Sequence, residues 1–271
     1  MKQLELPAWI YRQHGADYSR EVPHEGYGGW KEIPVSLPLA RTALVSMHVW
    51  AFPSRDEVPG LYSSHPYLPG AEIIVRDVFP PLLAAARGAG LPVIHVVGGK
   101  DYYSHFPGYK RAVELAGPEP EAPAGAAPDL EGVGKLRELI RDEGYPGADN
   151  LADLARAHGA TRIPHEASPV DGEYVVATTH QLNVVCRELN VAHLVYMGFN
   201  TNWCLLMSPC GMLDMQRLGY MCSLIRQATN AVESKESARG EKNKEEALWR
   251  TAVGFGLVFD DTSLIQALDS C

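Results

Sequence analysis

Residues 197–210, MGFNTNWCLLMSPC, combine a thiol with a backbone setting that would make it reactive. An apolar strand is expected to end at Gly198, and a polar turn then leads into a helix near Trp203, which places Cys204 in the first helical turn. Unpaired backbone N–H groups and the positive end of a helix dipole favour a thiolate over a thiol. The same N–H groups could stabilise a developing oxyanion. The alternative is that Cys204 is a small buried apolar side chain.

The run HLVYMGFNTNWCLLMSP, followed by LGYMCSLIRQATNAV, resembles the isochorismatase-like cysteine hydrolases. In that superfamily a strand and a Gly lead to Thr, two further residues and the nucleophilic Cys. TALVSMHVWAF and LPVIHVV extend the resemblance, which runs from about Arg41 to the C-terminus. It implies an α/β hydrolase that cleaves a small-molecule, non-peptide C–N bond through a Cys204 thioester. The backbone N–H groups of Asn200 and Cys204 would bind the oxyanion.

The superfamily uses an Asp, Lys and Cys triad, and this chain plainly keeps only the Cys. By register, His48 stands where the Asp is expected, and the Lys position falls on Ala177 or Thr178. The nearest lysine at another strand end is Lys100, which is the candidate for the catalytic Lys. We predict that His48 replaces the Asp, because a neutral imidazole can take a thiol proton and return it to a leaving amine. A structural histidine held by hydrogen bonds is the alternative.

Several aromatic and polar residues follow the predicted strands and are expected to line a substrate pocket at the carboxyl edge of the sheet. Aromatic residues at sheet ends cap the core as often as they bind ligands. An apolar wall would suit a compact, partly aromatic or planar substrate. The substrate-binding candidates are Trp50, Phe52, Tyr102, Phe106, Thr178, His180 and Trp203.

The elements that must position these residues alternate along residues 41–271. Apolar runs over 42–47, 91–97 and 193–198 predict strands that are adjacent near the middle of one sheet. Strand and helix alternation predicts a three-layer α/β domain with Rossmann-like topology, in which helices cover both faces of a mostly parallel sheet of about six strands. Residues 202–218 form one long helix in this interpretation.

Two segments stand outside this alternation. Residues 1–40 are rich in aromatic residues, Pro and Gly and show neither helical nor strand periodicity, so they are interpreted as an ordered arm that packs on its own domain or on another subunit. Residues 107–150 are rich in Pro, Gly, Ala and Glu and are interpreted as an insertion or lid, with one helix over 133–143.

Composition narrows the function classes. A net charge of -9, with scattered basic residues, argues against nucleic acid as a partner. Five cysteines without a CxxC pair favour free thiols in a reducing compartment, and no signal peptide or membrane span is recognised, so a cytoplasmic location is expected. The resemblance suggests a homo-oligomer, either a dimer or a tetramer.

No cofactor is expected, and the ten histidines show no metal-binding spacing. A metal held by Asp101 and His105 with His48 or His65 is a weaker hypothesis. Two alternatives to the amide hydrolase remain. One is a catalytically silent protein that binds a metabolite or a partner after the triad was lost. The other is a vinyl-ether hydrolase of the isochorismate type, which need not use a thiol.

Overall fold

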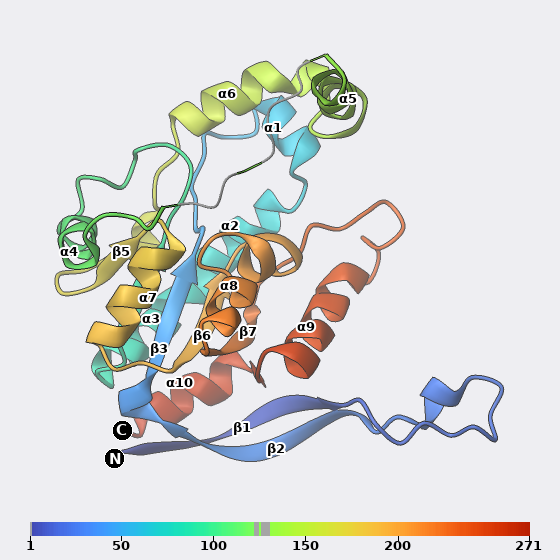
Figure 1. Cartoon of the computed structure of the whole chain (residues 1–271), viewed down its shortest axis with the longest axis vertical. Coiled ribbons are helices and arrows are strands. Elements are labelled where there is room, and N and C mark those ends of the chain that lie inside the picture. The colour runs from blue at the N-terminus through green and yellow to red at the C-terminus, as the bar shows by residue number, and fades with distance from the viewer. Residues whose placement is uncertain (1, 122–124, 126–130) are drawn as a thin grey trace.

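The computed structural model describes residues 2–121, 125 and 131–271. Its centre is one mixed sheet of eight strands in the order β2-β1-β8-β7-β6-β3-β4-β5 (Figure 1). The strands β3 to β8 run parallel, and β1 joins β8 and β2 in antiparallel pairing. The strands are β1 (Gln3–Arg12), β2 (Gly29–Pro38), β3 (Thr42–Met47), β4 (Val93–Val96), β5 (Tyr174–Val176), β6 (His193–Gly198), β7 (Met221–Thr229) and β8 (Val258–Phe259).

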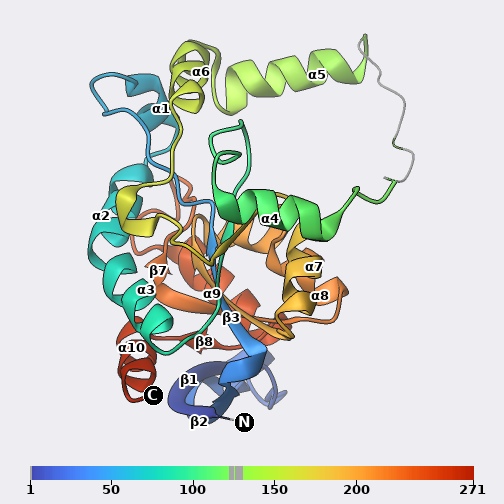
Figure 2. The ribbon, with the colours of Figure 1, turned by 90° about the vertical axis from the view of Figure 1, so that its left-hand side faces the viewer.

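Helices cover both faces of this sheet, which gives three layers (Figure 2). Buried residues of α2, α3 and α10 form one apolar cluster with the sheet, and those of α4, α7, α8 and α9 form the other. The helices are α1 (Pro59–Ser64), α2 (Leu68–Asp77), α3 (Phe79–Gly88), α4 (Pro107–Ala116), α5 (Val133–Leu139), α6 (Leu151–Gly159), α7 (Thr179–Glu188), α8 (Met212–Arg217), α9 (Lys242–Gly254) and α10 (Asp261–Asp269). The predicted fold class is therefore confirmed.

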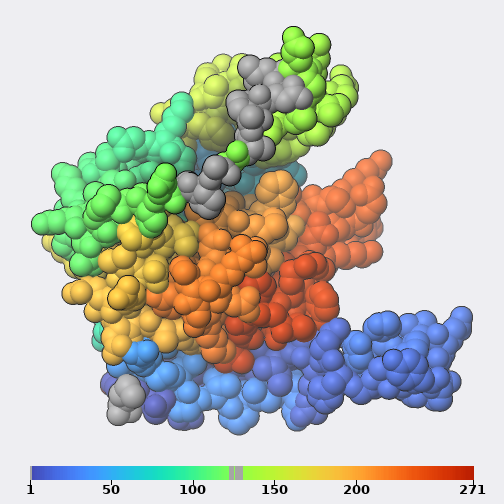
Figure 3. Space-filling view, in the orientation of Figure 1, coloured from blue at the N-terminus to red at the C-terminus, as the bar shows by residue number. Residues whose placement is uncertain are grey.

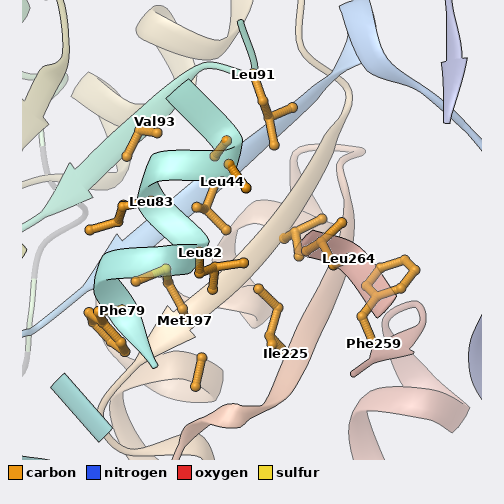
Figure 4. Packing of buried hydrophobic residues seen from close by; sticks show 14 of the residues in the cluster. Leu44, Phe79, Leu82, Leu83, Leu91, Val93, Met197, Ile225, Phe259 and Leu264 are labelled. Atoms are coloured by element: carbon orange, nitrogen blue, oxygen red, sulfur yellow. The ribbon is translucent and has the colours of Figure 1, made fainter. Parts of the chain in front are cut away.

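The central strands are apolar on both faces because both faces are buried. In β3, Ala43, Val45 and Met47 belong to one cluster, and Leu44 belongs to the other. Figure 4 shows α3 packed against Leu44, with Phe79 near the end of that helix. Such two-sided burial removes the period-two pattern of a half-exposed strand and leaves the continuous apolar run seen in the sequence.

The three strands predicted to be adjacent are adjacent, since β3 lies between β6 and β4. At the carboxyl end of this trio, Gly198 adopts φ +127° and passes so close to β3 that a Cβ would lie 1.9 Å from the Met47 carbonyl oxygen. Only glycine fits there. The close approach brings the segments that follow β3 and β6 to the same edge of the sheet.

The prediction that residues 1–40 lack strand periodicity is wrong. Residues 3–12 and 29–38 pair as a hairpin that extends the sheet from the expected six strands to eight, and its far end reaches beyond the body (Figures 1 and 3). The buried side chains of β1 alternate as Leu4, Leu6 and Ala8, but the Pro and aromatic residues between and after them obscure the pattern. The hairpin does pack on its own domain.

A cap formed by α1, α5 and α6 lies beyond the carboxyl edge of the sheet (Figures 1 and 2). The cap has a small core of its own, in which Leu61 of α1 packs with Leu154 and Ala157 of α6. The helix expected over residues 133–143 is present as α5 followed by a π-helical turn, Ile140–Gly144. Residues of the predicted insertion therefore face the edge where ligands bind in this kind of sheet.

Candidate active site

Cys204 lies in a short π-helical turn, Thr201–Leu205, directly after β6. The single long helix expected here is wrong, because helical structure stops after residue 207 and α8 begins only at Met212. Pro209 has no N–H to continue the helical hydrogen bonds. Gly211 passes so close to this turn that a Cβ on it would lie 2.8 Å from the Cys204 carbonyl oxygen. The thiol is thus carried by a tight turn.

The end of β7 holds this turn in place. The Thr201 N–H donates to the Asn230 carbonyl at 2.9 Å, and the Thr201 and Thr229 hydroxyls share a hydrogen bond of 2.6 Å. The Asn200 side-chain amide donates to Asn230 Oδ1 at 2.5 Å. All four side chains are buried, so the backbone around Cys204 is fixed by satisfied polar groups.

Aromatic side chains from the cap and from the start of α2 lie close to the turn that carries Cys204. The ring of Tyr145 lies 6.2 Å from the Trp203 ring, and the ring of His65 lies 5.7 Å from Tyr67 and 5.5 Å from Tyr145. Burial and, after it, the charge of a Cys204 thiolate raise the pKa of Tyr145. Burial, then Tyr145 and Cys204, raise the pKa of Tyr67. The thiol and both phenols therefore share one electrostatic environment.

His48 is buried at the end of β3, in a left-handed backbone conformation with φ 51°. Its ring stacks on Trp50 with centroids 4.8 Å apart, and its Nε2 is 3.0 Å from where a Cβ on Gly98 would lie. Burial lowers the pKa of His48 to about 4, so the imidazole is neutral at pH 7. Within the part of the chain described, His48 Nδ1 has no hydrogen-bond partner, and no hydrogen bond joins this ring to Cys204.

An apolar cavity of about 320 Å³ opens at the ends of β3 and β4. The Trp50 indole N–H donates to the Tyr102 hydroxyl at 2.6 Å and so fixes two of its walls. Lys100 is its cationic residue, and Lys100 adds to the larger effect of burial in lowering the pKa of His158. The lining residues are Trp50, Phe52, Gly98, Gly99, Lys100, Tyr102, His158 and Thr161.

The cavity and the Cys204 turn are linked through the cap. His158 of α6 lines the cavity, and its charge contributes, after burial, to a lowered pKa of His65. His65 in turn contacts Tyr145 beside Cys204. Trp50, Phe52, Lys100 and Tyr102, all expected from the sequence, line this cavity together. Cys204 and Trp203 are not among its lining residues.

Three other sequence candidates lie elsewhere. Thr178 caps the N-terminus of α7 and donates its hydroxyl proton to Glu119 at 2.6 Å, while His180 Nε2 is 3.0 Å from the Ala116 carbonyl oxygen. Phe106 precedes α4, with its ring against that of His105 at 4.2 Å. All three hold α4 in place, and none of them lines the apolar cavity.

Sequence reasoning did not include Tyr67, Tyr145 or His158, and it included His65 only as a metal ligand. No motif marks them: Tyr67 and Tyr145 lie outside the regular helices, and His158 is near the end of α6, a helix of the cap whose position over the sheet is set by packing. Among residues 2–121, 125 and 131–271, no three His, Cys, Asp or Glu side chains are grouped as metal ligands. No helix within the same ranges is long and apolar enough to cross a membrane.

No family model and no curated protein sequence matches this chain. The crystal structure of a cysteine hydrolase from Pseudomonas syringae pv. phaseolicola 1448A superposes with a TM-score of 0.51 and 17% identity, over 86% of this chain and 95% of that one. This chain has the fold of that cysteine hydrolase. The α/β fold expected from the sequence, with helices on both faces of a mostly parallel sheet, is thereby confirmed.

Two further solved structures superpose less well. An isochorismatase from Pseudomonas putida KT2440 superposes with a TM-score of 0.45 and 17% identity, over 83% of this chain and 90% of that one. An isochorismatase family protein from Desulfovibrio vulgaris subsp. vulgaris str. Hildenborough gives 0.43 and 19%, over 84% and 98%. Identities this low establish the fold alone, and the reaction must be argued from the site.

Proposed function

We propose that this protein is a cysteine hydrolase that cleaves a small-molecule, non-peptide C–N bond through a thioester on Cys204. The observation that carries the proposal is the difference between Cys204 and the other cysteines within the fold. Cys186, Cys210 and Cys222 are completely buried, and Cys204 is only partly buried. Burial raises the pKa of Cys186 and Cys222 to about 12 and also raises that of Cys210. Apart from the exposed Cys271 at the end of the chain, Cys204 is the cysteine that a substrate can reach.

The proposed reaction has two steps. The Cys204 thiolate attacks the amide carbon, the C–N bond breaks, and the amine leaves with a proton from the enzyme. Water then attacks the thioester and releases the acid and the thiol. The Asn200 backbone N–H donates to no hydrogen bond within the chain as described, which supports the proposal that it binds the oxyanion together with the Cys204 N–H.

His48 was predicted to accept the thiol proton, and it stays a candidate for that role. Its neutral state at pH 7 and its free Nδ1 support the candidacy. Its ring lies between Trp50 and Gly98, and within the described residues no hydrogen bond joins it to Cys204. Lys100 is proposed as a cation that attracts a polar or anionic end of the substrate in the apolar cavity.

Mass-spectrometric mapping tests the nucleophile. Iodoacetamide at pH 7 should alkylate Cys204 at least about tenfold faster than Cys186, Cys210 and Cys222, because only a thiolate reacts. Ammonia release from a panel of aromatic and aliphatic primary amides should then be measured for the parent and for Cys204→Ser, with Cys222→Ser as the matched control. Equal alkylation of all four cysteines would remove the proposal.

A catalytically silent binding protein is the second candidate. The observation in its favour is that Thr178, at the family's Lys position, is engaged in capping α7 and in bonding Glu119. In that case an aromatic carboxylate or amide should raise the unfolding temperature equally in the parent and in Cys204→Ser, with no turnover in either. A vinyl-ether hydrolase would instead turn over its substrate in both.

A further inference from the structure

We propose that Tyr145, backed by His65, takes the proton from the Cys204 thiol, in the role that the sequence suggests for His48. This inference rests on the proposed function of Cys204. Tyr145 comes from the segment between α5 and α6, and His65 follows α1, so the cap supplies both groups to a thiol on the sheet edge. Tyr145 would be the catalytic residue, and His65 would act through it as a positioning residue and proton acceptor.

The hydrogen bonds around His65 fix the direction of proton transfer. His65 Nδ1 lies 3.2 Å from the Leu61 carbonyl oxygen and 2.9 Å from Ser64 Oγ. The Ser64 hydroxyl is itself within 2.9 Å of the Gly60 carbonyl oxygen, to which it donates. A carbonyl oxygen can only accept, so Nδ1 carries the ring proton. Nε2 is then the acceptor, and the Tyr145 hydroxyl, 2.6 Å away, donates to it.

This arrangement leaves the lone pairs of the Tyr145 oxygen free to accept a second proton. The ring of Tyr145 lies against Trp203, the residue before Cys204, and its phenol interacts electrostatically with the Cys204 thiol. About half of the Tyr145 surface is exposed, so a substrate can approach the same atoms. A phenol with a base behind it is a better proton acceptor than a phenol alone, because the charge moves on to the imidazole.

The transfer balances without any further reactant. The Cys204 S–H gives its proton to the Tyr145 oxygen while the Tyr145 O–H proton passes to His65 Nε2, which leaves a thiolate, an intact phenol and an imidazolium. When the C–N bond breaks, the imidazolium returns its proton through Tyr145 to the leaving amine. His48 has no equivalent link, because its ring is enclosed by Trp50 and Gly98.

The surroundings of His65 set its charge state. Burial, and after it the charge of His158, lower the pKa of His65, while the Leu61 carbonyl opposes the shift. The other titratable groups near it are Tyr145, which donates to it, and Tyr67, whose ring contacts it. The imidazole is therefore neutral and able to accept a proton at pH 7.

The pH profile of Cys204 alkylation tests the relay without a substrate. The rate of iodoacetamide alkylation of Cys204 is recorded from pH 5 to pH 10. Tyr145→Phe and His65→Gln should each slow this reaction about tenfold at pH 7 and move the midpoint of the profile to higher pH, because less of the thiol is then ionised. Tyr18→Phe and His14→Gln, on the exposed hairpin, are the matched controls. Continued protection of Cys186 and Cys222 shows that each variant is folded.

The outcomes separate the two proposals. A Tyr145→Phe profile that superposes on that of the parent overturns the relay, and a slow His48→Gln variant in the same series would assign the base to His48 instead. If Tyr145→Phe slowed alkylation but His65→Gln did not, His65 would not be the proton acceptor of Tyr145, and the relay would also be overturned. Absence of amide hydrolysis, with the alkylation profiles as expected, would overturn the proposed reaction and leave the relay standing.

Discussion

Acidification from pH 7 to pH 5 should destabilise this protein through His48. Burial lowers its pKa from 6.5 to about 4 in the folded chain. The stabilisation that comes from burying the neutral ring is present above pH 6.5 and is lost as the pH falls towards 4, because the unfolded chain binds a proton that the folded chain refuses. For these two pKa values the loss between pH 7 and pH 5 is about 1.8 kcal/mol.

A substitution isolates this contribution from that of other histidines. His48→Gln has no ring to protonate, so its free energy of unfolding should fall by about 1.8 kcal/mol less than that of the parent over the same pH range. His14→Gln is the control, since that side chain is exposed and its loss should leave the parent's pH dependence unchanged.

Urea unfolding followed by tryptophan fluorescence at pH 5, 6 and 7 gives the three free energies. Parallel pH dependences for the parent and His48→Gln would show that the ring is not buried in its neutral form. The same result would undermine His48 as a candidate base, because that role requires an imidazole that stays neutral within the site.

Two further substitutions test the framework of the site. Gly198→Ala should lower the free energy of unfolding by about 3 kcal/mol or more, because the new Cβ would lie 1.9 Å from the Met47 carbonyl oxygen. Gly88→Ala is the control, since the space around Gly88 is open, and its free energy of unfolding should be unchanged or slightly raised. Urea unfolding measures both. Burial opposes ionisation of Glu173, but hydrogen bonds from His95 and Arg87 lower its pKa to about 2. Glu173→Gln should therefore cost about 3 kcal/mol at pH 7, and this difference should shrink as the pH falls from 4.5 towards 2; parallel pH dependences would contradict it.

Much of the fold could be predicted from local sequence. The runs that became β3, β4 and β6 are apolar on both faces, and this pattern is typical of a parallel sheet whose two sides are covered by helices. Gly198 marks the end of β6 because the backbone there leaves no room for a Cβ. The apolar runs and the Gly at the end of one of them are visible in the local sequence, so they can be interpreted without knowing which segments pack against them.

The hairpin of residues 3–38 could not be recognised in the same way. Its strands are held by pairing with each other and by Arg226 of β7, whose guanidinium lies between the Trp9 and Trp30 rings at 5.4 and 5.3 Å. Neither contact is local, and the aromatic residues that make them hide the alternation of Leu4 and Leu6.

The position of Cys204 in a helical turn that follows a strand was determined by the sequence alone, because the Gly, the polar residues and the Cys are neighbours in the chain. The groups that face Cys204 were decided only by the tertiary structure. Tyr145 and His65 are eighty residues apart, and their hydrogen bond exists because α1 and α6 pack into one small core above the sheet. Side chains from irregular segments carry no periodic signal, so only the packing of the cap brings them to the thiol.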